Sequence, residues 1–181
     1  CDQGGEIGPF IVMDMVLTHR GLRMGNRILP CSIGRSGLTQ HKREGDGATP
    51  VGTHRIVGML YRADRMACPT DWAIPIKPND LWSDDVRDVD YNMMVRAPHS
   101  YSHEKMRRAD PMYDLVILTD WNWPYPQKGA GSAIFIHAWR RPHASTAGCI
   151  GLSHANLLWV AQHIRYKTRL IIPPLAPALR K

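Results

Sequence analysis

The sequence predicts a mainly β fold with one α-helix. Short apolar segments rich in β-branched residues recur along the chain, glycine, proline and aspartate separate them, and one stretch near the C-terminal end has helical spacing of its apolar residues. The length of 181 residues fits one domain better than two. We therefore expect a single domain over residues 1–181, with a loose N-terminal segment at 1–9 and a C-terminal tail at 174–181.

The strands are predicted from alternation and from short apolar runs. Residues 10–18, FIVMDMVLT, carry β-branched residues at alternate positions, and YDLVILT and SAIFIHAW are apolar runs of strand length. The expected strands are 10–18, 27–34, 53–60, 113–119, 132–139 and 168–173. A helix should begin after Ser153, which is a good N-cap. A second short helix is expected near residues 100–109.

The middle of the chain, residues 61–112, has little periodicity and many Pro, Asp and Trp residues. Loops of this length inside a domain are uncommon and are often functional. We expect this segment to roof a substrate cleft, with tryptophans forming part of its wall. The alternative is that the same rings anchor long loops to the scaffold. The tryptophans concerned are Trp72, Trp82, Trp121 and Trp123.

The charge balance is basic, with 23 Lys and Arg against 16 Asp and Glu and a net charge of +7. Such a surplus favours an anionic partner. The basic residues are scattered, so neither a nucleic-acid-binding arm nor binding of nucleic acid is predicted. No segment is long and apolar enough to predict stable insertion into a membrane. An anionic wall polymer or substrate fits the charge at least as well as nucleic acid.

The four cysteines form no C-x-x-C pair, which excludes the usual zinc-ribbon and thioredoxin-type motifs. If Cys149 is a free thiol, Cys31 with Cys68 is the first disulfide to consider. A zinc site is the rival interpretation of the region around Cys149. Its ligands would be His137, His143, Cys149 and His154. Their spacing matches no usual structural zinc pattern, so we predict no metal and no other cofactor.

The most informative segment is IFIHAWRRPHASTAGCIGL, residues 134–152. An apolar strand ends near His137, and a short loop leads to Gly148 and Cys149. A thiol needs a neighbouring base to become a strong nucleophile, and a histidine can serve. Gly148 lets the backbone approach closely, so that main-chain N–H groups can face a developing oxyanion. The alternative is that Cys149 is a buried, unreactive cysteine that contributes only to the packing of the core.

This segment resembles the catalytic motif of the L,D-transpeptidase (YkuD-type) domain family, in which a His precedes a Ser/Thr-x-Gly-Cys box. Thr146 to Cys149 fills the box here. The segment GRSGLTQHKREGDGATPVGTHRI, residues 34–56, resembles the family's N-terminal signature. This signature and the H…STAGC motif, taken together, are similar to those of one proteobacterial branch of the family. The resemblance covers roughly residues 28–172.

The resemblance implies a β-sandwich with one or two short helices and long loops. It also implies a peptidoglycan L,D-transpeptidase that forms a thioester on Cys149, with His137 as base and Gly148 beside the oxyanion. Donor and acceptor would be wall stem peptides, joined through diaminopimelate in 1–3 or 3–3 links. Carbapenems would acylate the thiol. The expected location is the periplasm, although the chain carries no export signal.

Substrate binding is expected around the same motif, by Arg35, Trp139, Arg140, Arg141, Ser145 and Thr146. One departure from the family is Gly151, because many members have Arg two residues after the cysteine. Candidate replacements for that charge are Arg35, Lys42, Arg140 and Arg141. A related hydrolase that trims stems or releases wall-linked lipoprotein is the alternative activity. A sortase lacks support because its TLxTC box is absent, and a non-catalytic wall-binding module would require His137 and Cys149 to lie apart.

Overall fold

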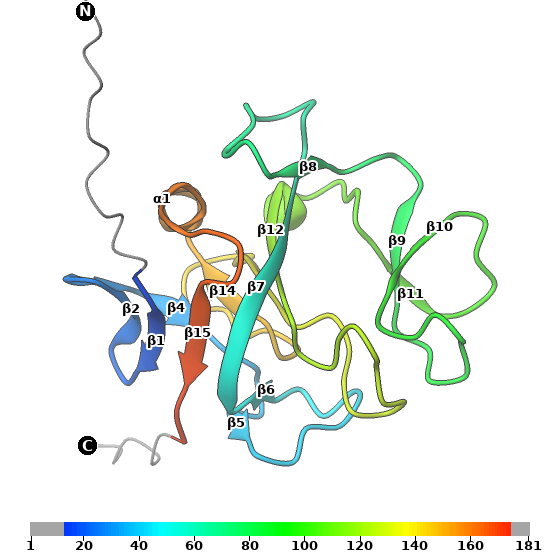
Figure 1. The fold of residues 1–181 in the computed structure, drawn as a ribbon, viewed down its shortest axis with the longest axis horizontal. Helices are drawn as coiled ribbons and strands as arrows, with labels where there is room; N and C mark the ends of the chain where they lie inside the picture. Colours follow the sequence, from blue (N-terminus) through cyan, green and yellow to red (C-terminus); the bar gives the residue numbers. More distant parts are fainter. Residues whose placement is uncertain (1–12, 175–181) are drawn as a thin grey trace, which may run out of the picture.

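The computed structural model of the protein describes residues 13–174. The segment expected to be loose, 1–9, and all but the first residue of the tail at 174–181 lie outside this range. Within it the chain is mainly β with one α-helix, so the predicted fold class is confirmed. The strand β7 runs through the centre of the structure, and the elements that follow it in the sequence lie on both sides of it (Figure 1).

Most strands form one long hydrogen-bonded path. In spatial order it contains β3 (Arg27–Leu29), β2 (Gly21–Met24), β1 (Met15–Thr18), β15 (Arg169–Ile172), β7 (Gly52–Tyr61), β12 (Leu115–Thr119), β13 (Phe135–Ala138), β14 (Ile150–Leu152) and β4 (Cys31–Ser32), with β8 (Ile74–Pro75) paired to β7. The ten-residue β7 belongs to both halves of the path, pairing with β15 at its start and with β12 at its end. The two halves enclose a shared apolar core, which gives a sandwich-like arrangement.

The second half of the sheet is buried on both faces. In β12, Leu115 and Ile117 point into the core shared with the first half, whereas Val116 and Leu118 belong to a second apolar cluster on the opposite face. Successive side chains of a strand alternate between faces, so a strand of five buried residues serves two cores. This explains why the sequence of β12 is a continuous apolar run.

The helix α1 (His154–His163) begins where the sequence predicts. The Ser153 hydroxyl accepts a hydrogen bond from the Asn156 N–H at 3.2 Å, which satisfies one of the free donors at the helix start. Leu157, Val160 and Ala161 are buried and pack into the core shared by the two halves of the sheet. The helix therefore closes this core.

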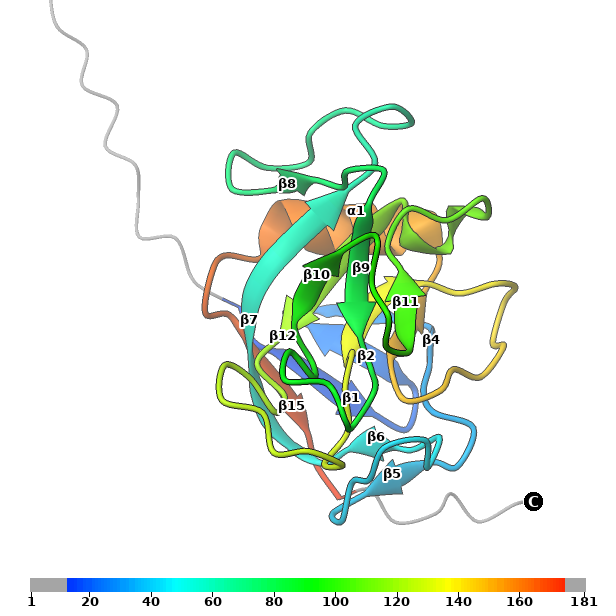
Figure 2. The same ribbon diagram turned by 90° about the vertical axis from the view of Figure 1, so that its right-hand side faces the viewer.

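A small sheet covers the second apolar cluster. It contains β10 (Met94–Arg96), β9 (Asp80–Ser83) and β11 (His103–Lys105), and it faces the viewer in Figure 2. The prediction of a helix near residues 100–109 is wrong, because His103–Lys105 pairs with β9 instead. A 3₁₀ turn, η1 (Pro111–Tyr113), follows shortly after. Two further short strands, β5 (Leu38–Thr39) and β6 (Thr49–Pro50), pair with each other.

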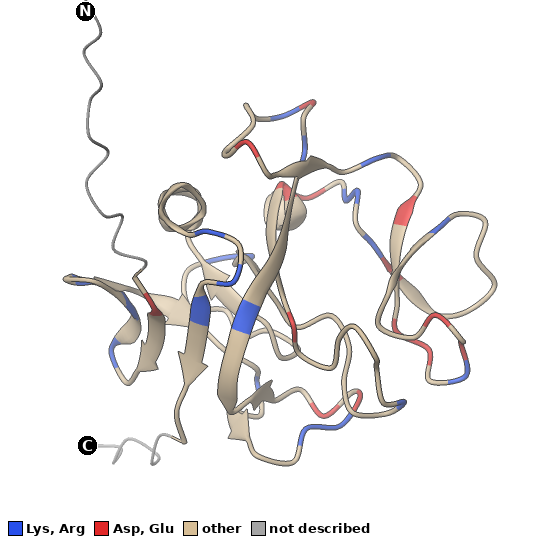
Figure 3. Ribbon diagram, viewed as in Figure 1, with Lys and Arg blue, Asp and Glu red and all other residues tan. Residues whose placement is uncertain are grey.

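The cysteines do not form the disulfide that the sequence suggested. Cys31 lies partly buried in β4, and Cys68 is exposed in the loop after β7, where its thiol donates to the carbonyl of Thr70. Both thiols are free, and Cys1 lies outside the described residues. Basic and acidic residues are interspersed over the loops (Figure 3). Among residues 13–174, no helix has the length and apolar character needed to span a membrane.

Candidate active site

The pairing of β13 with β14 brings the predicted catalytic residues to one face. Phe135 and His137 are two positions apart in β13 and therefore point to the same side of the sheet, opposite to Ile136. The parallel register pairs Ile136 with Ile150, so Cys149, the residue before β14, lies beside Phe135. The thiol and Phe135 belong to the second apolar cluster.

A cleft of about 1030 Å³ opens over this face. Cys149 and His137 both line it. So do all six residues that the sequence analysis expected to bind substrate, namely Arg35, Trp139, Arg140, Arg141, Ser145 and Thr146. Gly148, the residue before Cys149, does not line the cleft.

The Cys149 thiol is held by the backbone of β13 and of the residues before it. Its Sγ donates to the carbonyl of Ala133 (3.0 Å) and accepts from the N–H of Phe135 (3.4 Å). Burial, reinforced by the carboxylate of Glu104, raises the pKa of Cys149 to about 12. The thiol is consequently neutral near pH 7, and to act as a nucleophile it would need a base.

His137 is oriented by the carbonyl of the next residue. Its Nδ1 lies 2.8 Å from the Ala138 oxygen, and because a carbonyl only accepts, Nδ1 must carry the proton. The free lone pair is then on Nε2, which is the form a base requires. Burial lowers the pKa of His137 below its ordinary 6.5. No hydrogen bond joins the ring to the thiol of Cys149 in this structure.

The loop between β13 and β14, residues 139–149, carries the predicted nucleophile and is called the nucleophile loop below. Gly148 and Thr146 shape it. Gly148 has φ +147°, and a Cβ there would lie 2.9 Å from the carbonyl oxygen of Ala48, so only glycine fits without strain. The Thr146 hydroxyl donates to the carbonyl of Cys149 (2.6 Å) and accepts from the N–H of Gly148 (3.1 Å). The Gly148 N–H, expected to face an oxyanion, is therefore engaged by Thr146 here.

A buried threonine connects the two segments that carry the family resemblance. The Thr49 hydroxyl accepts from the N–H of Gly34 (2.8 Å) and donates to the carbonyl of Gly148 (2.7 Å). The backbone of Arg35 also donates to the carbonyl of Thr146 (2.9 Å). The segment at 34–56 thus supports the loop before Cys149 directly.

Neighbouring atoms already fill the space that a side chain at position 151 would need. A Cβ at this position would lie 2.4 Å from the Ser32 hydroxyl and 3.3 Å from the Cβ of Trp139. An arginine here would require these neighbours to move. Of the cations proposed as replacements, Arg35, Arg140 and Arg141 line the cleft. Lys42 does not: it is buried and forms an ion pair with Asp46.

The four tryptophans expected in the cleft wall lie elsewhere. None of Trp72, Trp82, Trp121 and Trp123 lines the cleft. Trp82 is buried, packs edge-on against Phe135 at 4.9 Å, and donates to Asn92 (3.0 Å). The indole of Trp121 donates to a backbone carbonyl (3.1 Å). The prediction was wrong because the composition of a segment does not tell which of its rings are used to attach it to the scaffold. The tryptophan in the cleft is Trp139.

One wall of the cleft comes from the end of the middle segment, which was expected to roof a cleft, although the sequence did not indicate which of its residues would do so. It is made by His103, Glu104, Lys105, Arg107, Arg108, Ala109, Asp110, Met112 and Tyr113. These residues come from β11, η1 and the turn between them, that is, from the end of the middle segment. The only sequence signal was the length of that segment, so a functional role for part of it was foreseeable but the residues were not.

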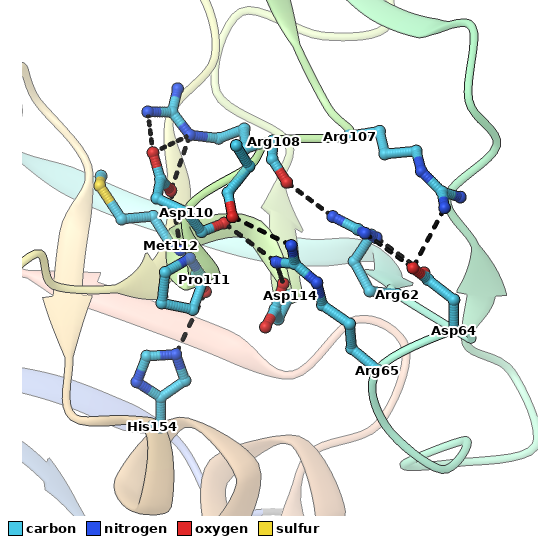
Figure 4. A network of polar contacts seen from close by, with 11 residues as sticks. Arg62, Asp64, Arg65, Arg107, Arg108, Asp110, Pro111, Met112, Asp114 and His154 are labelled. Atoms are coloured by element: carbon cyan, nitrogen blue, oxygen red, sulfur yellow. Dashed lines mark hydrogen bonds and ion pairs between the residues drawn. The ribbon is translucent and has the colours of Figure 1, made fainter.

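A polar network holds this wall in place (Figure 4). Arg62, just after β7, donates to the carbonyl of Arg108 (2.7 Å), and His154 of α1 contacts the carbonyl of Pro111 (3.1 Å). The other labelled members are Asp64, Arg65, Arg107, Asp110, Met112 and Asp114. Segment 107–114 is therefore tied both to the main sheet and to the helix.

The zinc alternative finds no support in the arrangement of the side chains. His143 packs against the ring of Trp139, and His154 contacts the backbone of η1. Within residues 13–174, no group of three or more His, Cys, Asp or Glu side chains gathers in a way that could hold a metal ion.

Comparison with known proteins identifies the family. The sequence profile of the YkuD family, described as the L,D-transpeptidase catalytic domain, matches residues 15–172. No curated protein matches the chain significantly. Among solved structures, L,D-transpeptidase 1 of Mycobacterium tuberculosis is 12% identical, with a TM-score of 0.43, covering 90% of this chain and 59% of that one. An L,D-transpeptidase from Mycobacterium smegmatis is 14% identical, with a TM-score of 0.42, covering 88% and 58%.

The chain thus spans less than two-thirds of the length of either mycobacterial protein. The profile match, by contrast, extends over nearly all the described residues, from β1 to β15. It includes both the segment around Thr49 and the nucleophile loop. The chain belongs to the YkuD family of L,D-transpeptidase catalytic domains.

Proposed function

We propose that the protein is a peptidoglycan L,D-transpeptidase that works through a thioester on Cys149. The observation that carries this proposal is the cleft shared by Cys149 and His137, in which the ring has its proton on Nδ1 and its Nε2 lone pair free. A neutral thiol beside a neutral imidazole is the resting state from which a base can remove the thiol proton as attack begins. The periplasm is the proposed location, because the wall lies there.

In the first half of the reaction, the Cys149 sulfur attacks a stem-peptide carbonyl that belongs to an L-centre. Nε2 of His137 takes the thiol proton and passes it to the departing amine of the D-residue. In the second half, an amine of another stem attacks the thioester and receives the acyl group. With the Gly148 N–H engaged by Thr146, backbone donors beside the thiol can serve the oxyanion after a small change of the loop.

The charge of the cleft suits a substrate with carboxylates. Six cations line it, namely Arg35, Lys105, Arg107, Arg108, Arg140 and Arg141, against two acids, Glu104 and Asp110. Arginine binds carboxylates with paired hydrogen bonds. We therefore propose that Arg35, Arg140 and Arg141, which are exposed, bind the carboxylates of the stems, with Trp139, Ser145 and Thr146 lining the approach to the thiol.

The test is incubation of the purified protein with peptidoglycan and with muropeptides, followed by mass spectrometry of the products. Transpeptidation predicts cross-linked dimers, and the masses of their fragments distinguish 1–3 from 3–3 links. Trimmed stems without dimers would assign the related hydrolase activity instead. Unchanged muropeptides, together with no mass increase from a carbapenem, would contradict the proposal.

The pH dependence of thioester formation follows from the state of His137. Only the neutral ring can accept the thiol proton, and burial lowers the pKa of His137 below 6.5. We expect the acid limb of the rate of Cys149 acylation by a carbapenem to have its midpoint below pH 6.5. Intact-mass time courses between pH 4.5 and 8 measure this rate. A midpoint above pH 7 would show that His137 is not the base or that its ring is not buried during reaction.

A further inference from the structure

A carboxyl group lines the same cleft as the thiol, and the mechanism described so far does not use it. Glu104 of β11 accepts a hydrogen bond from the hydroxyl of Tyr113 through its Oε2. The ring of Tyr113 packs edge-on against that of His137, with 5.2 Å between ring centres. Tyr113 also shares the second apolar cluster with Cys149. Glu104 is thus joined through one side chain to both predicted catalytic residues.

The second oxygen of Glu104, Oε1, takes part in no hydrogen bond with residues 13–174. It keeps some exposed surface, because it is not one of the fully buried atoms that lack a partner. Glu104 lines the cleft, and this oxygen is the part of the carboxyl group left free to meet a ligand.

Glu104 also differs from the other acid of the cleft. Asp110 is neutralised by Arg108, whose guanidinium forms an ion pair with it at 2.7 Å. Glu104 forms no ion pair within the described part of the chain, although six cations line the same cleft. The charge of Arg108 also acts on Glu104, but the two side chains form no ion pair. Of the two acids that line the cleft, Glu104 is therefore the one left to pair with a cationic ligand.

We propose that Glu104 selects the acceptor: its carboxylate binds the side-chain ammonium of the incoming stem and takes one proton from it. This inference rests on the proposed function, because it concerns the second half of that reaction. Glu104 thereby determines that the thioester passes to an amine of a cationic acceptor and not to water.

The proton transfers balance as follows. Glu104 carboxylate takes a proton from the ammonium, and the neutral amine attacks the thioester carbonyl. His137 removes the second proton from the attacking nitrogen, the C–S bond breaks, and the Cys149 thiolate recovers that proton from His137. The products are an amide and a neutral thiol, and Glu104 releases its proton to solvent. Burial raises the pKa of Glu104, which makes it a better proton acceptor than an exposed carboxylate.

The experiment measures how the acyl-enzyme divides between acceptor and water. Purified muropeptides serve as donor, and Nα-acetyl-lysine, with the side-chain ammonium as its one amine, serves as acceptor. Mass spectrometry gives the ratio of transfer to hydrolysis for the wild type and for Glu104→Gln. The glutamine still accepts from Tyr113 but loses the charge. Hydroxylamine, which is uncharged at neutral pH, is the second acceptor.

The structure offers a matched control. Tyr91 donates to Glu44 in the same type of tyrosine–carboxylate pair, but Glu44 does not line the cleft. The charge of Glu44 is only the smallest of the causes that shift the pKa of Glu104, so Glu44→Gln should change the ratio of transfer to hydrolysis far less than Glu104→Gln does. Glu104→Gln should reduce that ratio about 10- to 100-fold for Nα-acetyl-lysine, the effect of losing one charge-assisted hydrogen bond. Its ratio for hydroxylamine should stay within twofold of the wild type, and Glu104→Asp should restore part of the loss for the ammonium acceptor.

Three results would overturn the inference. The first is an unchanged ratio for Nα-acetyl-lysine in Glu104→Gln, and the second is an equal loss for hydroxylamine. The third is the absence of thioester formation in both Glu104 variants, which would make this residue structural. If the wild type itself forms no thioester with donor or carbapenem, the proposed function fails as well. Acylation is measured separately by intact mass, so these two failures are distinguishable.

Discussion

Replacing Cys149 by alanine should abolish both thioester formation and cross-linking. The sulfur is the atom that would be acylated, and no other thiol among the described residues lines the cleft. The protein should still fold, because the change removes one small atom from the second apolar cluster. The loss of its contacts with Ala133 and Phe135 should cost about 1–2 kcal/mol. Intact mass after carbapenem treatment and muropeptide products measure the first effect, and thermal unfolding measures the second.

Cys31→Ala is the matched control for this variant. Cys31 is a partly buried thiol whose pKa is likewise raised by burial, to about 11, but it lies in β4 and does not line the cleft. Its replacement should leave acylation unchanged. A Cys149→Ala protein that still gained the mass of the carbapenem or still formed dimers would exclude the covalent route.

Replacing His137 by glutamine should slow thioester formation by about 10²- to 10⁴-fold, the usual contribution of a positioned base. The high pKa of Cys149, about 12, leaves almost no thiolate near neutral pH, so the reaction depends on proton removal during attack. Glutamine retains a polar group that can donate to the carbonyl of Ala138, which limits the structural change. The measurement is the rate of acylation by carbapenem at saturating concentration, followed by intact mass.

His54→Gln separates loss of the base from the general effect of replacing a buried histidine. His54 is buried, its ring contacts the carbonyl of Pro50 at 3.1 Å, and burial lowers its pKa as it does for His137. Unlike His137, it does not line the cleft. The two variants should lose similar stability, but only His137→Gln should lose acylation. Equal rates in both would assign His137 a structural role.

The parts of the fold that the sequence predicted well are those in which local pattern and burial agree. The apolar runs at 113–119 and 132–139 became β12 and β13, and Ser153 caps α1 as expected. In each case one short segment is enough to predict its own structure. The strands are recognisable because both of their faces are buried, and the helix because its capping residue lies directly before it. Alternation along β13 put Phe135 and His137 on one face, and the parallel pairing of β13 with β14 placed Cys149 beside Phe135.

The parts that were missed depend on contacts between distant segments. The segment at 103–105 reads as part of a polar helix, but pairing with β9 makes it a strand. The pair of Glu104 and Tyr113 joins a strand to a 3₁₀ turn, and no spacing rule connects these two residues. The prediction of a disulfide between Cys31 and Cys68 was wrong for the same reason. The sequence around each cysteine does not tell whether the two lie close together in the fold.

The hydroxyl of Thr49 connects residues 99 positions apart in the chain, because it donates to the carbonyl of Gly148. Bringing two such distant residues together lowers the conformational entropy of the chain before the hydrogen bond can form. Contacts between residues far apart in the sequence therefore slow folding. During synthesis, Thr49 leaves the ribosome long before the nucleophile loop does. In a chain that is not yet fully folded, Cys149 is an ordinary, exposed thiol. We therefore expect the thiol to become buried only in the last cooperative step of folding. The reactive site would then form together with the final tertiary structure.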